Sequence, residues 1–198
     1  MRTMSGHMRG LIALLLLVTA PWAAALEQLE VEYVRPGVDF SQYTQVMIHP
    51  LNLERTKVIP PAWASDQSRK HWDLSADDRA FTQQLFLSTL TAEVEKDSRF
   101  HVVPFTGPGI MELEVKITSV TPFANRDEQV VTKGSGEISV RAEFIDGASG
   151  DLIAVLSGDQ SVGDSYQLNS IDTNRANVER LVTAWGKRLL NHLRAAQR

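Results

Sequence analysis

The histidines are the residues of this chain whose type could support acid–base or metal chemistry. Beyond residue 25 there are four of them, at His49, His71, His101 and His192. No two lie at H-x-H or H-E-x-x-H spacing, the patterns that bring two imidazoles to one metal ion. We interpret His49 and His101 as hydrogen-bonded strand residues and His192 as an edge residue of a helix. The sequence therefore predicts no metal site and no cofactor.

Nucleophilic catalysis would need a Ser or Cys with a His base and an orienting acid. The chain has no cysteine and no G-x-S-x-G sequence, and we interpret "GSG" at Gly134 to Gly136 as the flexible start of a strand. The nearest cluster is His71, Asp73 and Ser75, but Ser75 already fits a helix cap. We therefore predict no catalytic residue, and a cell-envelope hydrolase is only the third functional hypothesis.

The paired carboxylates have structural explanations. Asp77 and Asp78 follow a capping Ser in the first turn of a predicted helix, where the helix dipole favours negative charge. Glu112 and Glu114 alternate with apolar residues on a predicted strand, which places them on its solvent face. The glycines of "TGPG" at Thr106 to Gly109 precede a strand and no Lys-Ser or Lys-Thr follows, so they do not form a phosphate loop.

The long segment Glu54 to Asp73 contains the first candidate binding surface. Loops of this length are uncommon in compact domains and are usually functional or disordered. Aromatic and Arg side chains are enriched at binding hot spots. Folding of both Trp rings over the sheet is the favoured alternative. The candidate partner-binding residues are Trp63, Arg69, Lys70, His71 and Trp72.

A basic ridge on the last helix is the second candidate surface. Arg180, Lys187 and Arg194 are seven residues apart, so they share the face opposite the apolar stripe. Such a ridge could contact anionic lipid head groups or an acidic partner. A solvated helix face is the favoured alternative.

Two helices are predicted. The first begins at the Ser75 cap and runs to about Lys96, with one apolar stripe and a second apolar side. The second begins near Asn174 and runs almost to the end. The first stripe comprises Ala80, Phe86, Leu87, Leu90 and Val94, and the second side Phe81, Leu85 and Ala92; the last helix presents Val178, Leu181, Val182, Trp185, Leu189, Leu193 and Ala196.

About five strands are predicted. They cover Gln45 to Leu53, Phe100 to Val103, and the alternating segments "IMELEVKITSV", "EISVRAEF" and "LIAVLSG", the last two joined as a hairpin by "DGASGD". The order strand, helix, four strands, helix predicts an α+β fold. We expect a two-layer sandwich, with a mostly antiparallel sheet and both helices on one face.

The amino terminus has the pattern of a secretory signal peptide. Arg2 and Arg9 precede an apolar run from Leu11 to Ala20, which is too short to span a bilayer, and small residues follow. We predict cleavage between Ala25 and Leu26, leaving a single domain over 26–198 that is neither transmembrane nor lipid-anchored, because no Cys follows the small residues. We expect a periplasmic or secreted protein.

The charge excludes one partner class. Two arginines and no acidic residue leave with the predicted leader, so the net charge changes from −4 to −6. Non-specific nucleic-acid binding depends on Lys and Arg neutralising phosphates, so we expect no nucleic-acid partner.

Several segments together resemble a bacterial family, the domain of unknown function 3313. They are "YVRPGVDFSQYTQVMIHPLNLE", "WDLSADDRAFTQQLFLSTLTAEVEKDSRFHVV", "GPGIMELEVKITSVTP" and "GSGEISVRAEFIDGASGDLIAVLSGDQS" with the terminal Trp-bearing helix, from about Glu32 to Leu193. The resemblance implies an envelope protein and no catalytic residues. Many members carry a lipid-modified Cys after the leader, where this chain has Leu26.

Two non-catalytic hypotheses lead. The first is a module that binds another envelope protein through the Trp63 to Trp72 loop or an exposed sheet edge. The alternative is a protein that binds lipid or a small ligand in a groove between the sheet and the helices.

Overall fold

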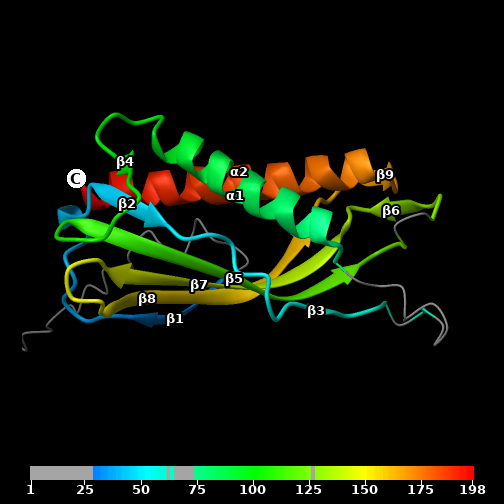
Figure 1. The fold of residues 1–198 in the computed structure, drawn as a ribbon, viewed down its shortest axis with the longest axis horizontal. Helices are drawn as coiled ribbons and strands as arrows, with labels where there is room; N and C mark the ends of the chain where they lie inside the picture. Colours follow the sequence, from blue (N-terminus) through cyan, green and yellow to red (C-terminus); the bar gives the residue numbers. More distant parts are fainter. Residues whose placement is uncertain (1–28, 62, 65–73, 126–127) are drawn as a thin grey trace, which may run out of the picture.

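Two helices lie across one face of a twisted β-sheet in the computed structural model of the protein (Figure 1). The structure describes residues 29–61, 63–64, 74–125 and 128–198. The helices are α1, Ala76–Val94, and α2, Ile171–Ala196. The predicted α+β class, with its two helices and mostly antiparallel sheet, is confirmed.

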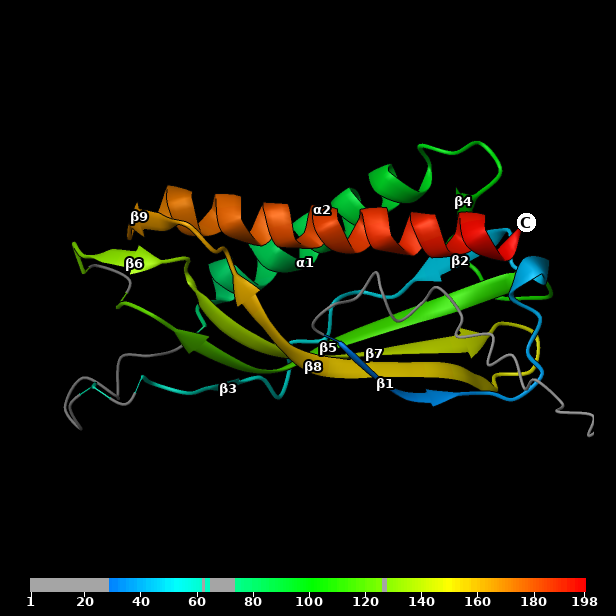
Figure 2. The same cartoon turned by 180° about the vertical axis from the view of Figure 1, so that it is seen from behind.

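The main sheet has seven strands in the order β1-β8-β7-β5-β2-β4, with β3 also beside β5. Its strands are β1 (Glu30–Val34), β2 (Gln45–Ile48), β3 (Lys57–Val58), β4 (His101–Val102), β5 (Ile110–Pro122), β7 (Gly136–Asp146) and β8 (Leu152–Val162). Strands β6 (Val131–Lys133) and β9 (Tyr166–Leu168) form a separate antiparallel ribbon. Seen from behind, this ribbon lies beside the first turns of α2 (Figure 2).

The prediction of about five strands was too low. The sequence-based assignment missed β1, β3, β6 and β9, none longer than five residues. Such short strands carry too few alternations to stand out. The predicted strand Gln45 to Leu53 ends early, at Ile48, and continues only as an isolated bridge between Asn52 and Lys116. The pairs β2–β5, β2–β4 and β3–β5 are parallel, so the sheet is mixed.

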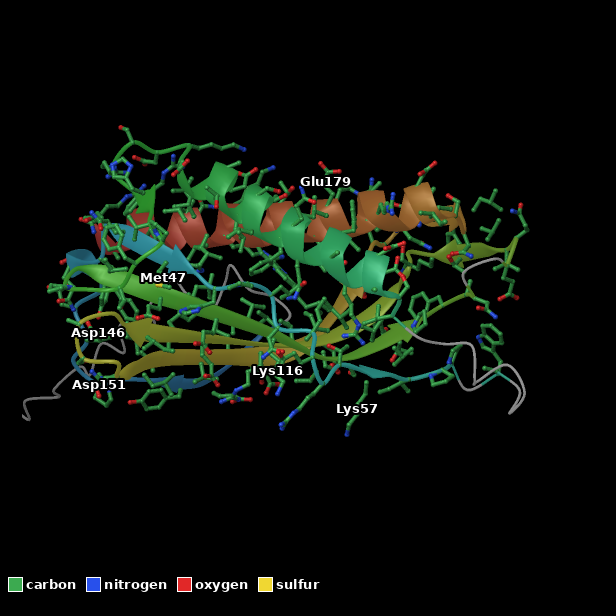
Figure 3. The ribbon with its side chains drawn as sticks, in the orientation of Figure 1. Met47, Lys57, Lys116, Asp146, Asp151 and Glu179 are labelled. Atoms are coloured by element: carbon green, nitrogen blue, oxygen red, sulfur yellow. The ribbon has the colours of Figure 1, made fainter. Side chains whose placement is uncertain are left out.

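The centre of the sheet is the antiparallel set β5, β7 and β8. Met111, Leu113, Val115 and Ile117 of β5 are buried, so the predicted inward face is correct. The hairpin between β7 and β8 turns at 147–151, as predicted, with Gly150 in the left-handed region. The outer face is polar, and Lys116 extends from it on the side of the sheet away from the helices (Figure 3).

Helix α1 begins as predicted but packs differently. Ser75 and Asp78 form a reciprocal capping box, because the Ser75 hydroxyl accepts from the Asp78 backbone and the Asp78 carboxylate accepts from that of Ser75. Phe86, Leu90 and Val94 are buried as expected, whereas Ala80 and Leu87 of the same predicted stripe are exposed. The helix crosses α2, so its buried face is shared between the sheet and the other helix.

The crossing of the helices depends on Gly186. A Cβ at this position would lie 2.6 Å from the Cβ of Glu93, closer than side chains normally approach. Glu93 is buried at this contact, and its carboxylate accepts a hydrogen bond from Lys96 Nζ at 2.6 Å. The absence of a side chain at Gly186 therefore lets α1 and α2 pack closely.

Helix α2 begins at Ile171, three residues before the predicted start, with a second capping box formed by Ser170 and Thr173. Its predicted apolar stripe faces the sheet, while Glu179 lies on its outer side (Figure 3). His192 was predicted as an edge residue, but it is buried, with 7% of its surface exposed. The close packing of α2 on the sheet covers the margin of the stripe as well as its centre.

Candidate ligand groove

A groove with a volume of about 330 Å³ lies between the two layers, near the end of the sheet that leads to the β6–β9 ribbon. The first turns of α1 and α2 line it on one side, and β5, β7 and the segment after β2 line it on the other. Its apolar walls include Leu53, Ile117, Ile138, Val178, Leu181 and Trp185.

The walls of the groove differ in burial: Leu53 and Ile117 belong to the buried core, whereas other apolar side chains of the lining are partly accessible. Ile138, Val178 and Trp185 pack against the buried cluster yet stay partly accessible. Protein interiors are otherwise packed to the density of organic crystals. The apolar side chains therefore have contact surface available for an apolar occupant.

Polar groups gather on one part of the lining. Asn174, in the first turns of α2, donates from Nδ2 to Asn169 Oδ1 at 2.9 Å, while its own Oδ1 is buried and has no partner among the described residues. Ser135 Oγ accepts from Asn177 Nδ2 at 2.7 Å. A concave, mostly apolar site with a few polar groups is typical of ligand-binding sites.

Arg175 is the cation of the groove. Its guanidinium carbon lies 4.6 Å from the centre of the Phe81 ring, and both residues line the groove. This stacking joins α1 to α2 while leaving the N–H groups of the guanidinium available to an anion. Two carboxylates also line the groove: Asp78, which belongs to the cap of α1, and Glu137, which is exposed at the start of β7.

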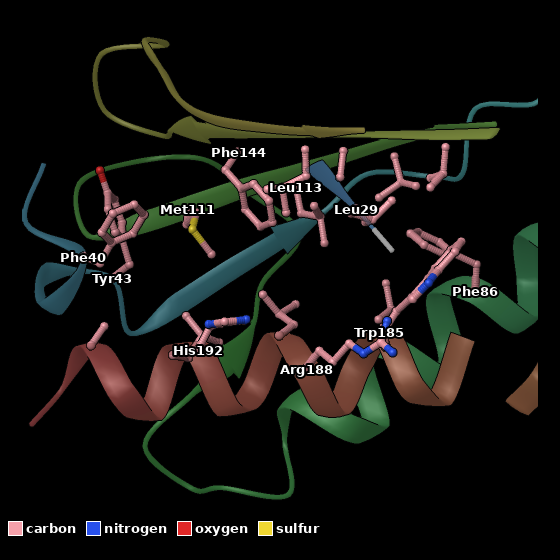
Figure 4. Close-up of a pocket in the computed structure, with 18 residues that line it drawn as sticks. Leu29, Phe40, Tyr43, Phe86, Met111, Leu113, Phe144, Trp185, Arg188 and His192 are labelled. Atoms are coloured by element: carbon pink, nitrogen blue, oxygen red, sulfur yellow. The ribbon is translucent and has the colours of Figure 1, made fainter. Parts of the chain in front are cut away.

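A second, smaller hollow of about 70 Å³ lies further along the same interlayer (Figure 4). Side chains of the sheet close it on one side, and α2 with Phe86 and Leu90 of α1 closes it on the other. Trp185 and Phe86 lie together at one end, and Phe40 and Tyr43 at the opposite end (Figure 4). The lining is almost entirely apolar, with His192 and Arg188 as its basic side chains.

Burial affects the chemistry of two groups at this second hollow. Burial lowers the pKa of His192, so its ring is neutral at neutral pH. Burial, together with a hydrogen bond from its hydroxyl to Asp146 Oδ2 at 2.7 Å, raises the pKa of Tyr43. Both side chains therefore enter the interlayer uncharged, as an apolar hollow requires.

The outer face of the sheet holds the polar contact of His49. His49 Nε2 lies 2.7 Å from Glu112 Oε2, and the Thr106 hydroxyl donates to the same carboxylate. These hydrogen bonds, that of Thr106 first, lower the pKa of Glu112. His49 thus has the hydrogen-bonded placement predicted from the sequence, and Glu112 and Glu114 lie on the polar face.

Only part of the first candidate surface can be placed. Trp63 is 61% exposed, so its ring does not cover the sheet. Arg69, Lys70, His71 and Trp72 lie outside the described residues. The proposed binding role of this segment stays a prediction.

The three residues of the basic ridge differ in exposure and in their hydrogen bonds. Arg180 and Lys187 are exposed, and Arg180 donates to the Asn177 side chain. Arg194 is half-buried, and its Nε donates to Asp97 Oδ2 at 2.8 Å, which ties the end of α2 to the segment after α1. Hydrogen bonds from Arg99 and then Arg194 lower the pKa of Asp97. A partner role of the ridge stays a prediction.

The described ranges of the chain contain neither a candidate metal site nor a candidate membrane-spanning helix. Within them, no three His, Asp or Glu side chains are arranged to hold a metal ion. Neither α1 nor α2 has the length and apolar character of a membrane-spanning helix, in the part of the chain the structure describes.

Sequence reasoning did not bring together the residues that line the groove. Arg175 was assigned to no surface, although Phe81 was placed on the second apolar side of the first helix. The sequence features that could have indicated the groove were this second apolar side and a cation in the first turns of the last helix. Their juxtaposition depends on the angle at which the helices cross, which the sequence pattern does not specify.

Some solved structures resemble this chain. The PelC dodecamer from Paraburkholderia phytofirmans matches with a TM-score of 0.36 and 8% identity, over 79% of this chain and 96% of that chain. Protein XCC0632 from Xanthomonas campestris matches with a TM-score of 0.45 and 7% identity, over 83% and 91%. Lipoprotein GNA1162 from Neisseria meningitidis matches with a TM-score of 0.33 and 13% identity, over 75% and 97%. Likeness at these levels concerns the fold alone.

No curated protein matches the chain. A family model does, and it spans residues 22–189, which include α1, the sheet, the residues that line the groove and α2 as far as Leu189. The segments quoted above from the sequence all lie within this range or continue from it. The chain therefore belongs to the family described as protein of unknown function, DUF3313.

Proposed function

We propose that this protein is a non-catalytic binding protein of the cell envelope. Its ligand is a single-chain amphiphile whose hydrocarbon chain lies in the groove and whose carboxylate or phosphate head binds Arg175. The observation that supports this proposal most is an apolar interlayer groove of about 330 Å³ with polar groups on one part of its lining.

The walls of the groove favour a hydrocarbon chain. Leu53 of the segment after β2, Ile117 of β5, and Val178 and Leu181 of α2 offer apolar surface on both layers. Burying a methylene group contributes about 0.8 kcal/mol, so each added carbon should tighten binding up to about fourfold until the groove is full. A flat polar ligand would leave these apolar walls in contact with water.

The charges of the lining favour an anionic head at Arg175. Its guanidinium stacks on Phe81 and is joined to no carboxylate of the described residues. Asp78 is already satisfied by the cap of α1. Glu137 adds a negative charge at the start of β7, and we place the anionic head beside Arg175 for this reason.

The envelope location is supported by the leader pattern. A basic start, a short apolar run and the alanines before Leu26 are typical of an exported chain. The proposed ligand would accordingly be an amphiphile of the cell envelope.

Calorimetric titration with laurate and with dodecanol tests the proposal. We expect saturable binding of both at one site, and we expect Arg175→Ala to weaken laurate binding about tenfold, because a charged hydrogen bond is lost. The affinity for dodecanol, which has no charge, should change by less than about twofold in the same variant.

Arg55→Ala is the matched control for this titration. Arg55 is exposed and does not line the groove, so its loss should leave both ligands unaffected. Absence of laurate and dodecanol binding by the folded wild-type chain would refute the proposed function. Equal weakening by both Arg substitutions would refute the assigned head-group contact.

A second candidate function is binding of another envelope protein by strand addition. Strand β1 is the end strand of the sheet, all five of its residues are exposed, and Val31, Tyr33 and Val34 are apolar. An edge strand of this kind can pair with a strand of a partner. Cross-linking in intact cells should then join a partner to this strand, and Val31→Pro should remove that product; recovery of the monomer alone would contradict this function.

A further inference from the structure

The groove and the smaller hollow lie end to end between the same two layers. On β5, Val115 lines the hollow and Ile117 lines the groove; on β7, Val140 lines the hollow and Ile138 the groove. Residues two apart on a strand share a face, so each strand continues from one space into the other.

The helices show the same continuity. On α1, Thr82 lines the groove and Phe86 the hollow, one helical turn later. On α2, Val182 lines the groove and Leu189 the hollow. Trp185 stands between them and lines both spaces. The two spaces are therefore consecutive parts of one interlayer, and Trp185 is at their boundary.

Two contacts fix the Trp185 ring at this boundary. It meets Phe86 edge-on, with ring centres 6.4 Å apart and an angle of 76° between the planes. Its Nε1 donates a hydrogen bond to Gln160 Oε1 at 2.5 Å. An edge-to-face pair and a hydrogen bond together hold a ring in one orientation.

The orientation of Gln160 follows from this bond. An indole nitrogen only donates, so the amide oxygen of Gln160 must face Trp185. Gln160 is 1% exposed, and its Nε2 has no partner among the described residues. A buried amide with one unpaired donor lowers the stability of the fold. An apolar side chain would avoid this cost, so we infer that Gln160 serves to orient the Trp185 ring.

We propose that Trp185 is the end wall of the chain-binding site and sets the longest hydrocarbon chain that the groove accepts. This inference rests on the proposed function. The terminal methyl of the bound chain would contact the Trp185 ring, and the hollow behind the ring stays closed to it. Removal of the ring joins the two spaces and admits a longer chain.

The size of the hollow gives the expected shift. At about 15 Å³ for each water-sized group, the upper end of the usual range, a space of about 70 Å³ accommodates roughly five such groups. Opening the boundary should therefore move the preferred chain length by roughly four to five carbons. The hollow is lined by apolar side chains, so added methylenes find favourable contacts there.

The test is a calorimetric titration of the full mature chain with saturated fatty acids from octanoate to stearate. For the wild-type protein, we expect affinity to rise with each carbon and then to stop rising at a defined length. For Trp185→Ala, the rise should continue for roughly four more carbons. Trp185→Leu, which keeps an apolar helix-forming residue, should show a smaller shift in the same direction and replaces the Ala variant if that chain does not fold.

Two variants control for loss of core packing. Phe100→Ala removes a fully buried ring that lines neither space, so it should destabilise the protein without changing the preferred length. Ala142→Val adds bulk to the wall of the hollow, so combined with Trp185→Ala it should shorten the preferred length again.

The outcomes separate the two proposals. A wild-type chain that is folded and binds no fatty acid refutes the proposed function. A wild-type chain that binds, together with folded Trp185 variants of unchanged preferred length, overturns the end-wall inference and leaves the proposed function standing. The same shift in Phe100→Ala would also overturn it.

Discussion

Thr82→Trp should reduce binding of laurate at least about tenfold, measured by calorimetric titration. Thr82 is half-buried on α1, one turn before Phe86, and lines the groove. An indole at this position would occupy the space proposed for the chain, and the helix itself would lose little, because Trp and Thr have similar helix propensities. The expected loss therefore reports occupancy of the groove and not a change of fold.

Ser88→Trp on the same helix is the matched control. Ser88 is exposed and lines neither interlayer space, so an added ring there should leave laurate affinity unchanged. Circular dichroism of both variants establishes that α1 is intact. Undiminished binding by a folded Thr82→Trp chain would place the ligand outside the groove.

Gly134→Ala should lower the free energy of unfolding by about 3 kcal/mol, measured by urea denaturation. Gly134 has a φ of +78°, in the left-handed region. A Cβ there would also lie 2.7 Å from the carbonyl carbon of Gly163 and 2.8 Å from the carbonyl oxygen of Val162. The backbone after β6 and the backbone after β8 touch at this point, and neither can move without displacing the ribbon.

Gly150→Ala separates the cost of a positive φ from the cost of a steric clash with the neighbouring backbone. Gly150 has a similar φ of +73°, but nothing lies within 4 Å of a Cβ placed there. This variant should cost about 1 kcal/mol, the conformational penalty alone. Equal losses at Gly134 and Gly150 would contradict the close approach of the two segments.

The same glycine shows where sequence reasoning was incomplete. "GSG" at 134–136 was interpreted as a flexible start of a strand, yet Gly134 is required by contact with Gly163, twenty-nine positions away. Local sequence indicates that a positive φ is allowed. It does not identify the distant segment that makes a side chain impossible.

The helices were predicted best because their signals are local. The Ser75 cap located the start of α1, and the periodic apolar residues located α2, although its Ser170 cap was missed and its start was predicted three residues too late. The predicted burial of α1 residues was wrong where α1 packs against a second element. Leu87 is exposed and Glu93 buried, because α1 packs against α2 at Gly186 as well as against the sheet.

The sequence predicted that a groove could lie between the sheet and the helices, but not which residues would line it. A space between sheet and helices follows from the two-layer fold, but its lining combines α1, α2, β5, β7 and the segment after β2. Arg175 reaches Phe81 only because the first part of α1 lies close to the first part of α2. Distances between such elements depend on crossing angles and strand register, which a single sequence does not give.

The most direct measurement is native mass spectrometry of the protein purified from its own host. We expect a non-covalent adduct with the mass of a single-chain amphiphile, released on denaturation and absent from Thr82→Trp. A wild-type spectrum that shows only the unliganded chain, or an adduct equally retained by Thr82→Trp, would contradict a chain-binding groove.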